Sequence, residues 1–299
     1  MKTKYILIAL IICWIFSCKT FQKNTTNLNK VKWISGSENC KENKDPLIQI
    51  VKYNSNTFIL RQNKCTNYEA PFLFLFLGNK KALLMDTGAT EDSLKFPLYK
   101  TVKNIIGDWE KNTKNSIDLI VAHTHAHGDH TAGDIQFKNK IRTEIVGLNV
   151  SDVSAYFNLK NWPLQNGQID LGNRVIEIVP IPGHQPASIA VYDYATKLLL
   201  SGDSFYPGRL YIRDWKAYKL SMQRLVDFAA VHKVSYFVGN HIEMTITAGK
   251  DYPAGTTYQP AEHMLPLTFK DLKELNNALK IAGDIPKYEV HNNFIVYPK

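Results

Sequence analysis

Four histidines and one aspartate lie within eight consecutive residues, His123-Thr-His-Ala-His-Gly-Asp-His130. Neutral imidazole and carboxylate are ligands of zinc, and they also suit iron and manganese. The preceding segment from Ile117 to Ala122 is apolar and rich in β-branched residues, which is typical of a buried strand. A strand that ends in such a cluster predicts a metal site at the edge of an α/β sheet.

Further candidate ligands follow other apolar segments. His184 lies in Ile181-Pro-Gly-His-Gln-Pro-Ala-Ser188, and Asp203 follows Gly202 after the apolar run Leu198-Leu-Leu200. His241 comes directly after Phe237-Val-Gly-Asn240. Upstream, Asp86 lies in Met85-Asp-Thr-Gly88, again at the end of an apolar segment. We therefore expect strand ends to bring these side chains together.

These motifs resemble those of the metallo-β-lactamase superfamily over roughly residues 47 to 245. The histidine run is similar to the family's His-x-His-x-Asp-His signature, and the other segments match its later ligand positions in order. The resemblance implies two divalent metal ions, zinc first, with iron or manganese as alternatives. It implies seven ligands, namely His125, His127 and His184 for one ion, Asp129, His130 and His241 for the other, and Asp203 as the bridge.

The resemblance also implies a hydrolase in which a hydroxide bridging the two metals attacks the substrate. Metal coordination lowers the pKa of bound water from about 15.7 towards about 7. Asp129 would orient this hydroxide as well as bind metal. Asp86 either braces the metal loop or caps the helix that follows. His123 does not match the signature, because aligning the signature with His123 as its first histidine would put Ala126 or His127 where the aspartate belongs. We expect His123 in the pocket wall.

The implied fold is α/β, a four-layer αββα sandwich, and the sequence pattern agrees with it. Strands are predicted at 47–53, 57–61, 72–77, 81–85, 117–122, 174–180, 188–192 and 197–200. Two helices are predicted at about 92–106 and 217–231. A short helix is predicted to begin after Ser151 as its cap, and a last helix after the capping box of Thr268 and Asp271. We expect residues 31–299 to form one hydrolase domain.

The substrate is a small molecule whose class the sequence leaves open among esters, lactones and thioesters. Tyr206 occupies a place similar to a tyrosine of the quorum-signal lactonases. In this chain we expect it to be either a catalytic residue or an aromatic residue of the pocket wall. Gly202-Asp-Ser-Phe-Tyr206 also resembles a stretch of glyoxalase II, a thioesterase, although the chain past residue 245 does not match that enzyme. A β-lactamase is the alternative, but zinc β-lactamases lack the aspartate found here at Asp203.

A non-catalytic, metal-stabilised binding lipoprotein is the alternative of another class. Degenerate members of the family lose ligands, whereas every expected ligand is present here. The segment from Ile242 to Pro266 has no apolar periodicity and leaves directly from His241. We expect a substrate-covering loop, with Tyr252, Tyr258 and His263 as candidate contacts, or else a decorative surface loop.

The first residues predict export. Lys2 and Lys4 precede an apolar run from Tyr5 to Phe16, which is shorter than the about 20 residues that cross a bilayer. Cys18 after Ile-Phe-Ser resembles a bacterial lipobox. We expect a lipoprotein signal at 1–17, a tether at 18–30 and a membrane anchor on Cys18, facing the periplasm or the cell surface. Ordinary cleavage and an uncleaved anchor are the alternatives.

Charge and cysteines complete the sequence argument. The net charge of +9 comes from 36 basic and 27 acidic residues without an arginine-rich block, so nucleic acid is not predicted as a partner. Outside the signal, Cys40 and Cys65 remain. In an oxidising compartment they form either a disulfide or two buried thiols. The oligomeric state is not indicated.

Overall fold

The computed structural model describes residues 25–299. The expected signal peptide at 1–17, the anchor Cys18 and the first part of the tether lie outside the described residues. Within 25–299, no helix is both long and apolar enough to span a membrane.

The first sheet has six strands in the order β1-β2-β3-β4-β5-β6. They are β1 (Ile48–Asn54), β2 (Thr57–Gln62), β3 (Phe72–Leu77), β4 (Lys81–Met85), β5 (Asp118–Ala122) and β6 (Thr143–Ile145). The strands β1 to β4 form antiparallel hairpins, whereas β4, β5 and β6 run parallel. Helix α1 (Leu98–Thr113) is the crossover that parallel pairing of β4 and β5 requires.

The second sheet has the order β13-β12-β10-β9-β8-β7. These strands are β7 (Gly167–Asp170), β8 (Val175–Pro180), β9 (Ile189–Asp193), β10 (Leu198–Gly202), β12 (Tyr236–Gly239) and β13 (Pro266–Leu267). Helix α4 (Trp215–Val231) lies between the parallel strands β10 and β12, and α5 (Phe269–Ala282) follows β13. A small third sheet contains β11 (Arg209–Ile212), β15 (Ile295–Pro298) and β14 (Glu289–Val290).

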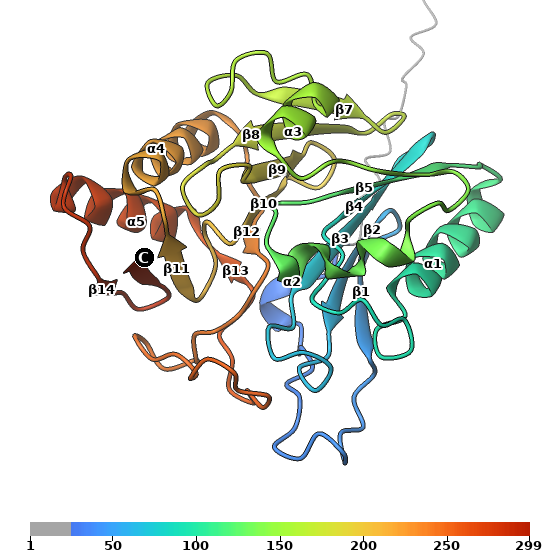
Figure 1. Cartoon of the computed structure of the whole chain (residues 1–299), viewed down its shortest axis with the longest axis horizontal. Helices are drawn as coiled ribbons and strands as arrows, with labels where there is room; N and C mark the ends of the chain where they lie inside the picture. Colours follow the sequence, from blue (N-terminus) through green and yellow to red (C-terminus); the bar gives the residue numbers. More distant parts are fainter. Residues whose placement is uncertain (1–24) are drawn as a thin grey trace, which may run out of the picture.

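Strand β3 shows how the layers are built. Its sequence is Phe-Leu-Phe-Leu-Phe-Leu, and all six side chains are buried. Alternate residues of a strand face opposite sides of the sheet. The phenylalanines therefore pack in the core between the two sheets, while the leucines pack in a second core under α1. A third core lies between the second sheet and helices α4 and α5. The predicted αββα layering is thus confirmed, with α1 and the pair α4–α5 on opposite sides (Figure 1).

Most predicted elements are present, but two helix starts were wrong. The helix predicted at about 92–106 begins at Leu98, because the residue before Pro97 is disfavoured in helical conformation, and it ends only at Thr113. Helix α3 (Val150–Tyr156) is capped by Asn149, whose side chain accepts from the Asp152 amide, and not by Ser151. The capping box of Thr268 and Asp271 is confirmed. The segment 242–265 contains only isolated bridges, as expected of a loop.

Candidate metal centre

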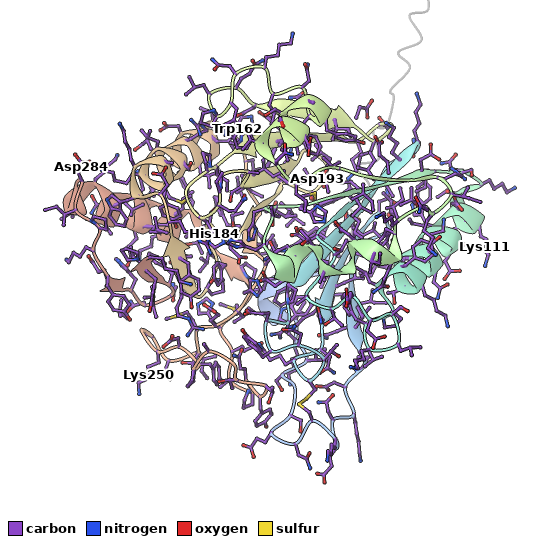
Figure 2. The ribbon with its side chains drawn as sticks, in the orientation of Figure 1. Lys111, Trp162, His184, Asp193, Lys250 and Asp284 are labelled. Carbon is purple, nitrogen blue, oxygen red and sulfur yellow. A yellow bond between two sulfur atoms is a disulfide. The ribbon has the colours of Figure 1, made fainter. Side chains whose placement is uncertain are left out.

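Strands of both sheets deliver the seven predicted ligands to one place. The histidine run follows β5 and continues into the short helix α2 (Gly128–Thr131), which carries Asp129 and His130. His184 lies on the connection between β8 and β9, Asp203 directly follows β10, and His241 comes two residues after β12. Figure 2 shows His184 near the middle of the molecule.

The first group comprises His125, His127 and His184. Nδ1 of His127 lies 3.0 Å from Nε2 of His125 and 3.0 Å from Nε2 of His184. A tetrahedral ion with nitrogen ligands at about 2.1 Å has ligand–ligand edges of about 3.4 Å. The three nitrogens therefore converge at close to the spacing that one divalent ion requires.

The second group comprises Asp129, His130, Asp203 and His241. Nε2 of His241 lies 3.3 Å from both Nε2 of His130 and Oδ2 of Asp129. Asp203 reaches both groups, since its Oδ2 lies 3.4 Å from His130 Nε2 and 3.8 Å from His125 Nε2. Its Oδ1 is buried and has no hydrogen-bond partner. A carboxylate between two sets of nitrogens is the arrangement that a bridge between two cations needs, so the residues present fit two divalent metals.

Hydrogen bonds at the outer nitrogens orient several of these imidazoles. Nδ1–H of His184 donates to the Tyr211 carbonyl at 2.7 Å, and Nδ1–H of His241 donates to the Glu69 carbonyl at 2.9 Å. Each of these bonds leaves the Nε2 lone pair facing the centre. Fixing the tautomer in this way is what metal-binding histidines require.

Asp86 braces the metal loop and does not cap a helix. Its backbone has a φ of 68°, which is strained for a residue with a side chain. The carboxylate is fully buried and accepts from the Thr124 amide at 2.8 Å, from the Thr124 hydroxyl at 3.0 Å and from the Asn240 amide at 2.7 Å. It therefore ties the ends of β4, β5 and β12 together, which places His125 and His241 relative to each other.

The two groups differ in their electrostatics. Burial lowers the pKa of His125 and His184, and lowers that of His127 to about 4. In the second group burial also disfavours the charged histidines, but the carboxylates outweigh it. Asp203 and Asp129 raise the pKa of His130 well above its usual value and that of His241 to about 9. Without metal, the first group is neutral at pH 7, whereas the second holds protons between carboxylates.

Two other sequence candidates have different surroundings. His123 is buried, and its Nε2–H donates to the Asp134 carboxylate at 2.9 Å. It belongs to neither ligand group and does not line the pocket at the centre, so its expected place in the pocket wall was wrong. The ring of Tyr206 lines the cavity at the metal centre. Its hydroxyl lies 2.6 Å from the Arg209 carbonyl and 3.1 Å from a Glu243 carboxylate oxygen. These acceptors hold the phenol proton, an arrangement that suits a pocket-wall aromatic.

A cavity of about 300 Å³ opens at the centre, and five of the ligands line it, namely His127, Asp129, His184, Asp203 and His241. The loop after β12 contributes Glu243 here and lines an adjoining cavity with Pro253 to Thr256 and Gln259. The expected contacts Tyr252, Tyr258 and His263 line neither cavity. Tyr252 instead uses its hydroxyl to accept from the Ala261 amide within the loop.

Several cavity residues escaped the sequence argument. They are Lys64, Glu69, Arg209, Tyr211, Arg213, Glu243 and Lys299. The one signal that pointed to any of them was proximity in sequence, since Glu243 lies two residues after His241. The others come from segments whose meeting depends on the tertiary fold.

Comparison with known proteins places these motifs in a family. The profile of the Metallo-beta-lactamase superfamily matches residues 72–281. Human "Acyl-coenzyme A thioesterase MBLAC2" is 27% identical over 175 residues, which cover 49% of this chain and 61% of the human protein. A hydroxyacylglutathione hydrolase of Nostoc punctiforme is 28% identical over 127 residues, covering 39% of this chain and 49% of that protein. The similarity thus spans only about half to three fifths of these relatives.

The crystal structure of a metallo-β-lactamase from Hirschia baltica superposes with a TM-score of 0.50. The alignment covers 78% of this chain and 98% of that protein, at 14% sequence identity. At this identity the likeness concerns the fold alone.

Proposed function

Because this chain belongs to the metallo-beta-lactamase superfamily, we propose that it is a metal-dependent hydrolase that cleaves acyl bonds, with thioesters as its first substrate class. The observation that carries the proposal is the pair of ligand groups that share Asp203 at the base of an open cavity. The names of the relatives, a thioesterase and a hydroxyacylglutathione hydrolase, support thioesters over lactones and simple esters.

Each ligand group would hold one divalent cation, zinc first, with iron or manganese as alternatives. When bound, the two cations would supply a bridging hydroxide nucleophile at neutral pH and stabilise the negative charge that develops on the substrate carbonyl oxygen. Asp129 is partly exposed to the cavity, and its Oδ2 contacts His130 and His241. It is therefore placed to orient the nucleophile towards the substrate as well as to bind metal.

A hydrolysis screen of the metal-loaded protein tests this function. The panel contains thioesters, lactones, aryl esters and β-lactams, each followed by release of its product. We expect thioester turnover that Asp203→Ala abolishes. Hydrolysis of lactones or β-lactams without thioester turnover would contradict the substrate class. No hydrolysis by protein that holds two equivalents of metal would favour a non-catalytic binding protein.

We also propose that the protein is exported and attached to a membrane through Cys18, with residues 31–299 as the hydrolase domain. The charged start, the short apolar run and Cys18 support this, and a disulfide suits an oxidising compartment. Cys18→Ala should prevent lipidation and release the protein from the membrane fraction. Cys13→Ala, within the same signal, is the matched control and should leave processing intact. A soluble wild-type protein that retains Met1 would contradict the proposal.

A further inference from the structure

A second cavity of about 230 Å³ adjoins the metal centre. It shares Glu69, Tyr211, His241, Glu243 and Lys299 with the cavity above the ligands, so the two cavities lie side by side. A substrate whose reacting carbonyl lies at the metal centre has this space available for the rest of its length. The loop segment from Pro253 to Thr256 forms part of its wall.

Lys64 lines this second cavity although its side chain is only 3% exposed. Its ammonium has three N–H donors, but its contacts are long, at 3.4 Å to the Tyr68 carbonyl and 3.6 Å to Oε1 of Glu262. Both oxygens of Glu262 already accept from Arg61 at 2.6 Å. A buried ammonium without close acceptors is costly unless a ligand supplies them.

Two other cations line this cavity, Arg209 and Lys299. The ammonium of Lys299 lies over the ring of Tyr211, 3.9 Å from its centroid. Arg209 binds Glu243 at 2.7 Å and Asp251 at 2.6 Å. Lys64 has no comparable ion pair. Burial and the nearby Arg61 lower the pKa of Lys64 to about 8, so most of it still carries its charge at pH 7.

We propose that Lys64 binds an anionic group of the substrate, a carboxylate or a phosphate, at a distance from the bond that is cleaved. This rests on the proposed thioesterase function and specifies its substrate as a charged acyl thioester. The ammonium would donate to the anion in a buried setting, where hydrogen bonds between charged groups are short and strong.

Matched thioesters test the proposal and locate the charge. Butyryl-N-acetylcysteamine is the neutral reference, succinyl-N-acetylcysteamine adds a carboxylate to the acyl part, and butyryl-N-acetylcysteine adds one to the leaving thiol. Butyryl-phosphopantetheine against butyryl-pantetheine tests a phosphate. We expect the wild-type kcat/KM for at least one charged thioester to exceed that of its neutral partner about tenfold or more.

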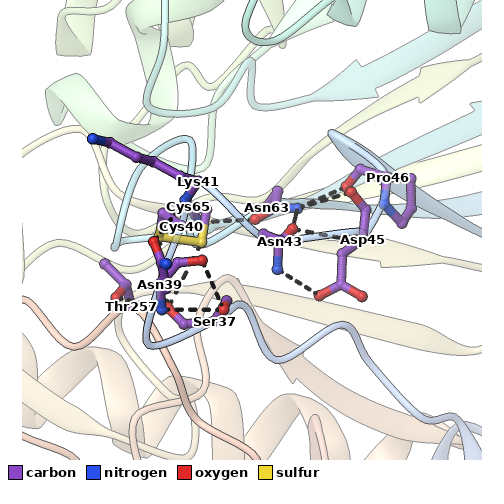
Figure 3. Close-up of a disulfide and its surroundings, with 10 residues drawn as sticks. All are labelled: Ser37, Asn39, Cys40, Lys41, Asn43, Asp45, Pro46, Asn63, Cys65 and Thr257. Atoms are coloured by element: carbon purple, nitrogen blue, oxygen red, sulfur yellow. Dashed lines mark hydrogen bonds between the residues drawn. A yellow bond between two sulfur atoms is a disulfide. The ribbon is translucent and has the colours of Figure 1, made fainter.

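Lys64→Met keeps the length and apolar stem of the side chain but removes the charge. We expect it to reduce this preference to near unity. Lys41→Met is the matched control, because Lys41 is exposed, lies near the disulfide and lines neither cavity (Figure 3). Metal content and thermal unfolding of both variants check that the fold is retained. A preference that survives in Lys64→Met, or no preference in the wild type, would overturn the proposal.

Binding without turnover separates this proposal from the proposed function. S-methyl-N-acetylcysteine and S-methyl-N-acetylcysteamine differ by one carboxylate, and neither can be hydrolysed as a thioester. S-methyl-phosphopantetheine and S-methyl-pantetheine form the matching pair that differs by one phosphate. Calorimetric titration should show tighter binding of at least one charged compound to the wild type, with the difference lost in Lys64→Met but not in Lys41→Met. This result without thioester turnover would retain the anion site and reject the thioesterase. Equal affinities of both proteins for the charged compounds would reject the site.

Discussion

At the scale of single residues, the metal centre consists of two electrostatically unlike halves. His125, His127 and His184 are neutral at pH 7 because burial opposes their protonation. His130 and His241 keep protons because Asp129 and Asp203 face them. A divalent metal would therefore bind the first group without displacing a proton, whereas it would have to displace protons from the second.

The two metals should therefore differ in their pH dependence. A raised histidine pKa strengthens the competition of protons with metal at every pH below that value, about 9 for His241. We expect protein dialysed at pH 8 to retain about two equivalents of zinc and protein at about pH 6 to retain about one. Calorimetry in buffers of different ionisation enthalpy should show proton release mainly with the second equivalent. Simultaneous loss of both metals on acidification would argue against this order.

Substitutions at the centre should separate ligands from neighbours. Among residues 25–299, Asp203 is the one carboxylate within 4 Å of histidines of both groups. Asp203→Ala should lower kcat/KM about 100-fold or more and lose most of the second metal. His123 contacts Asp134 instead of the centre, so His123→Ala should keep both metals. Elemental analysis distinguishes these outcomes, and equal metal loss in His123→Ala and His125→Ala would contradict the assigned ligands.

At the scale of elements, the loop after β12 is held at both ends by ion pairs. Arg209 of β11 binds Glu243 and Asp251, and Arg61 of β2 binds Glu262. The N-terminal segment supports the middle of the loop, since the Ser37 amide donates to the Thr257 carbonyl at 3.1 Å and the Gln259 amide donates to the Ser35 carbonyl at 2.9 Å. In Figure 1 the two segments lie at the same lower end of the molecule. Contacts from β2, β11 and the N-terminal segment thus hold in place the loop that forms part of the cavity wall.

Removing one loop contact should alter substrate binding more than chemistry. Asp251→Ala removes a charge-assisted contact to Arg209 that is worth about 1–2 kcal/mol, given its partial exposure. We expect KM to rise several-fold with a smaller change in kcat, and amide exchange in residues 250–259 to accelerate. Asp284→Ala removes an ion pair of similar length, between the almost fully exposed Asp284 and Lys219, and should change neither the kinetic constants nor the amide exchange of the loop. Unchanged amide exchange in Asp251→Ala would show that the loop does not depend on this pair.

At the scale of the whole molecule, long-range links join the parts that carry the ligands. Arg174 forms a buried ion pair with Asp193 of the second sheet at 2.6 Å and donates to the Leu77 carbonyl of the first sheet at 3.1 Å. The disulfide of Cys40 and Cys65 joins the N-terminal segment to the connection between β2 and β3 (Figure 3). Because the ligands come from both sheets, their spacing depends on such links.

Breaking the disulfide should lower stability without emptying the metal centre. It spans 25 residues, for which loop-closure entropy predicts about 3 kcal/mol. Cys40→Ser with Cys65→Ser should reduce the free energy of unfolding in denaturant by about this amount, while metal content stays at the wild-type value. In the wild type both thiols should resist alkylation until reduced. Rapid alkylation of the untreated protein would show that the bond does not form.

Features that depend on a few neighbouring residues could be predicted from the sequence by itself. The ligands could be predicted because each lies in a local motif at a strand end, as with His184 and Asp203. Strands β3 and β4 were predicted with their observed bounds, since alternation and apolar runs report directly on burial in a sheet. The disulfide remained an open alternative, because pairing requires two segments to meet in space.

Only the tertiary structure decided how distant segments meet. Asp86 was equally readable as a helix cap until the fold brought Thr124 and Asn240 to its carboxylate. Lys64 looked like an ordinary polar residue, and its burial at the cavity depends on β2, the connection to β3 and the loop after β12 packing together. Local propensity acts over a few residues, whereas the walls of a substrate cavity are set by contacts between segments that are up to about 200 residues apart, as in the pair of Arg61 and Glu262.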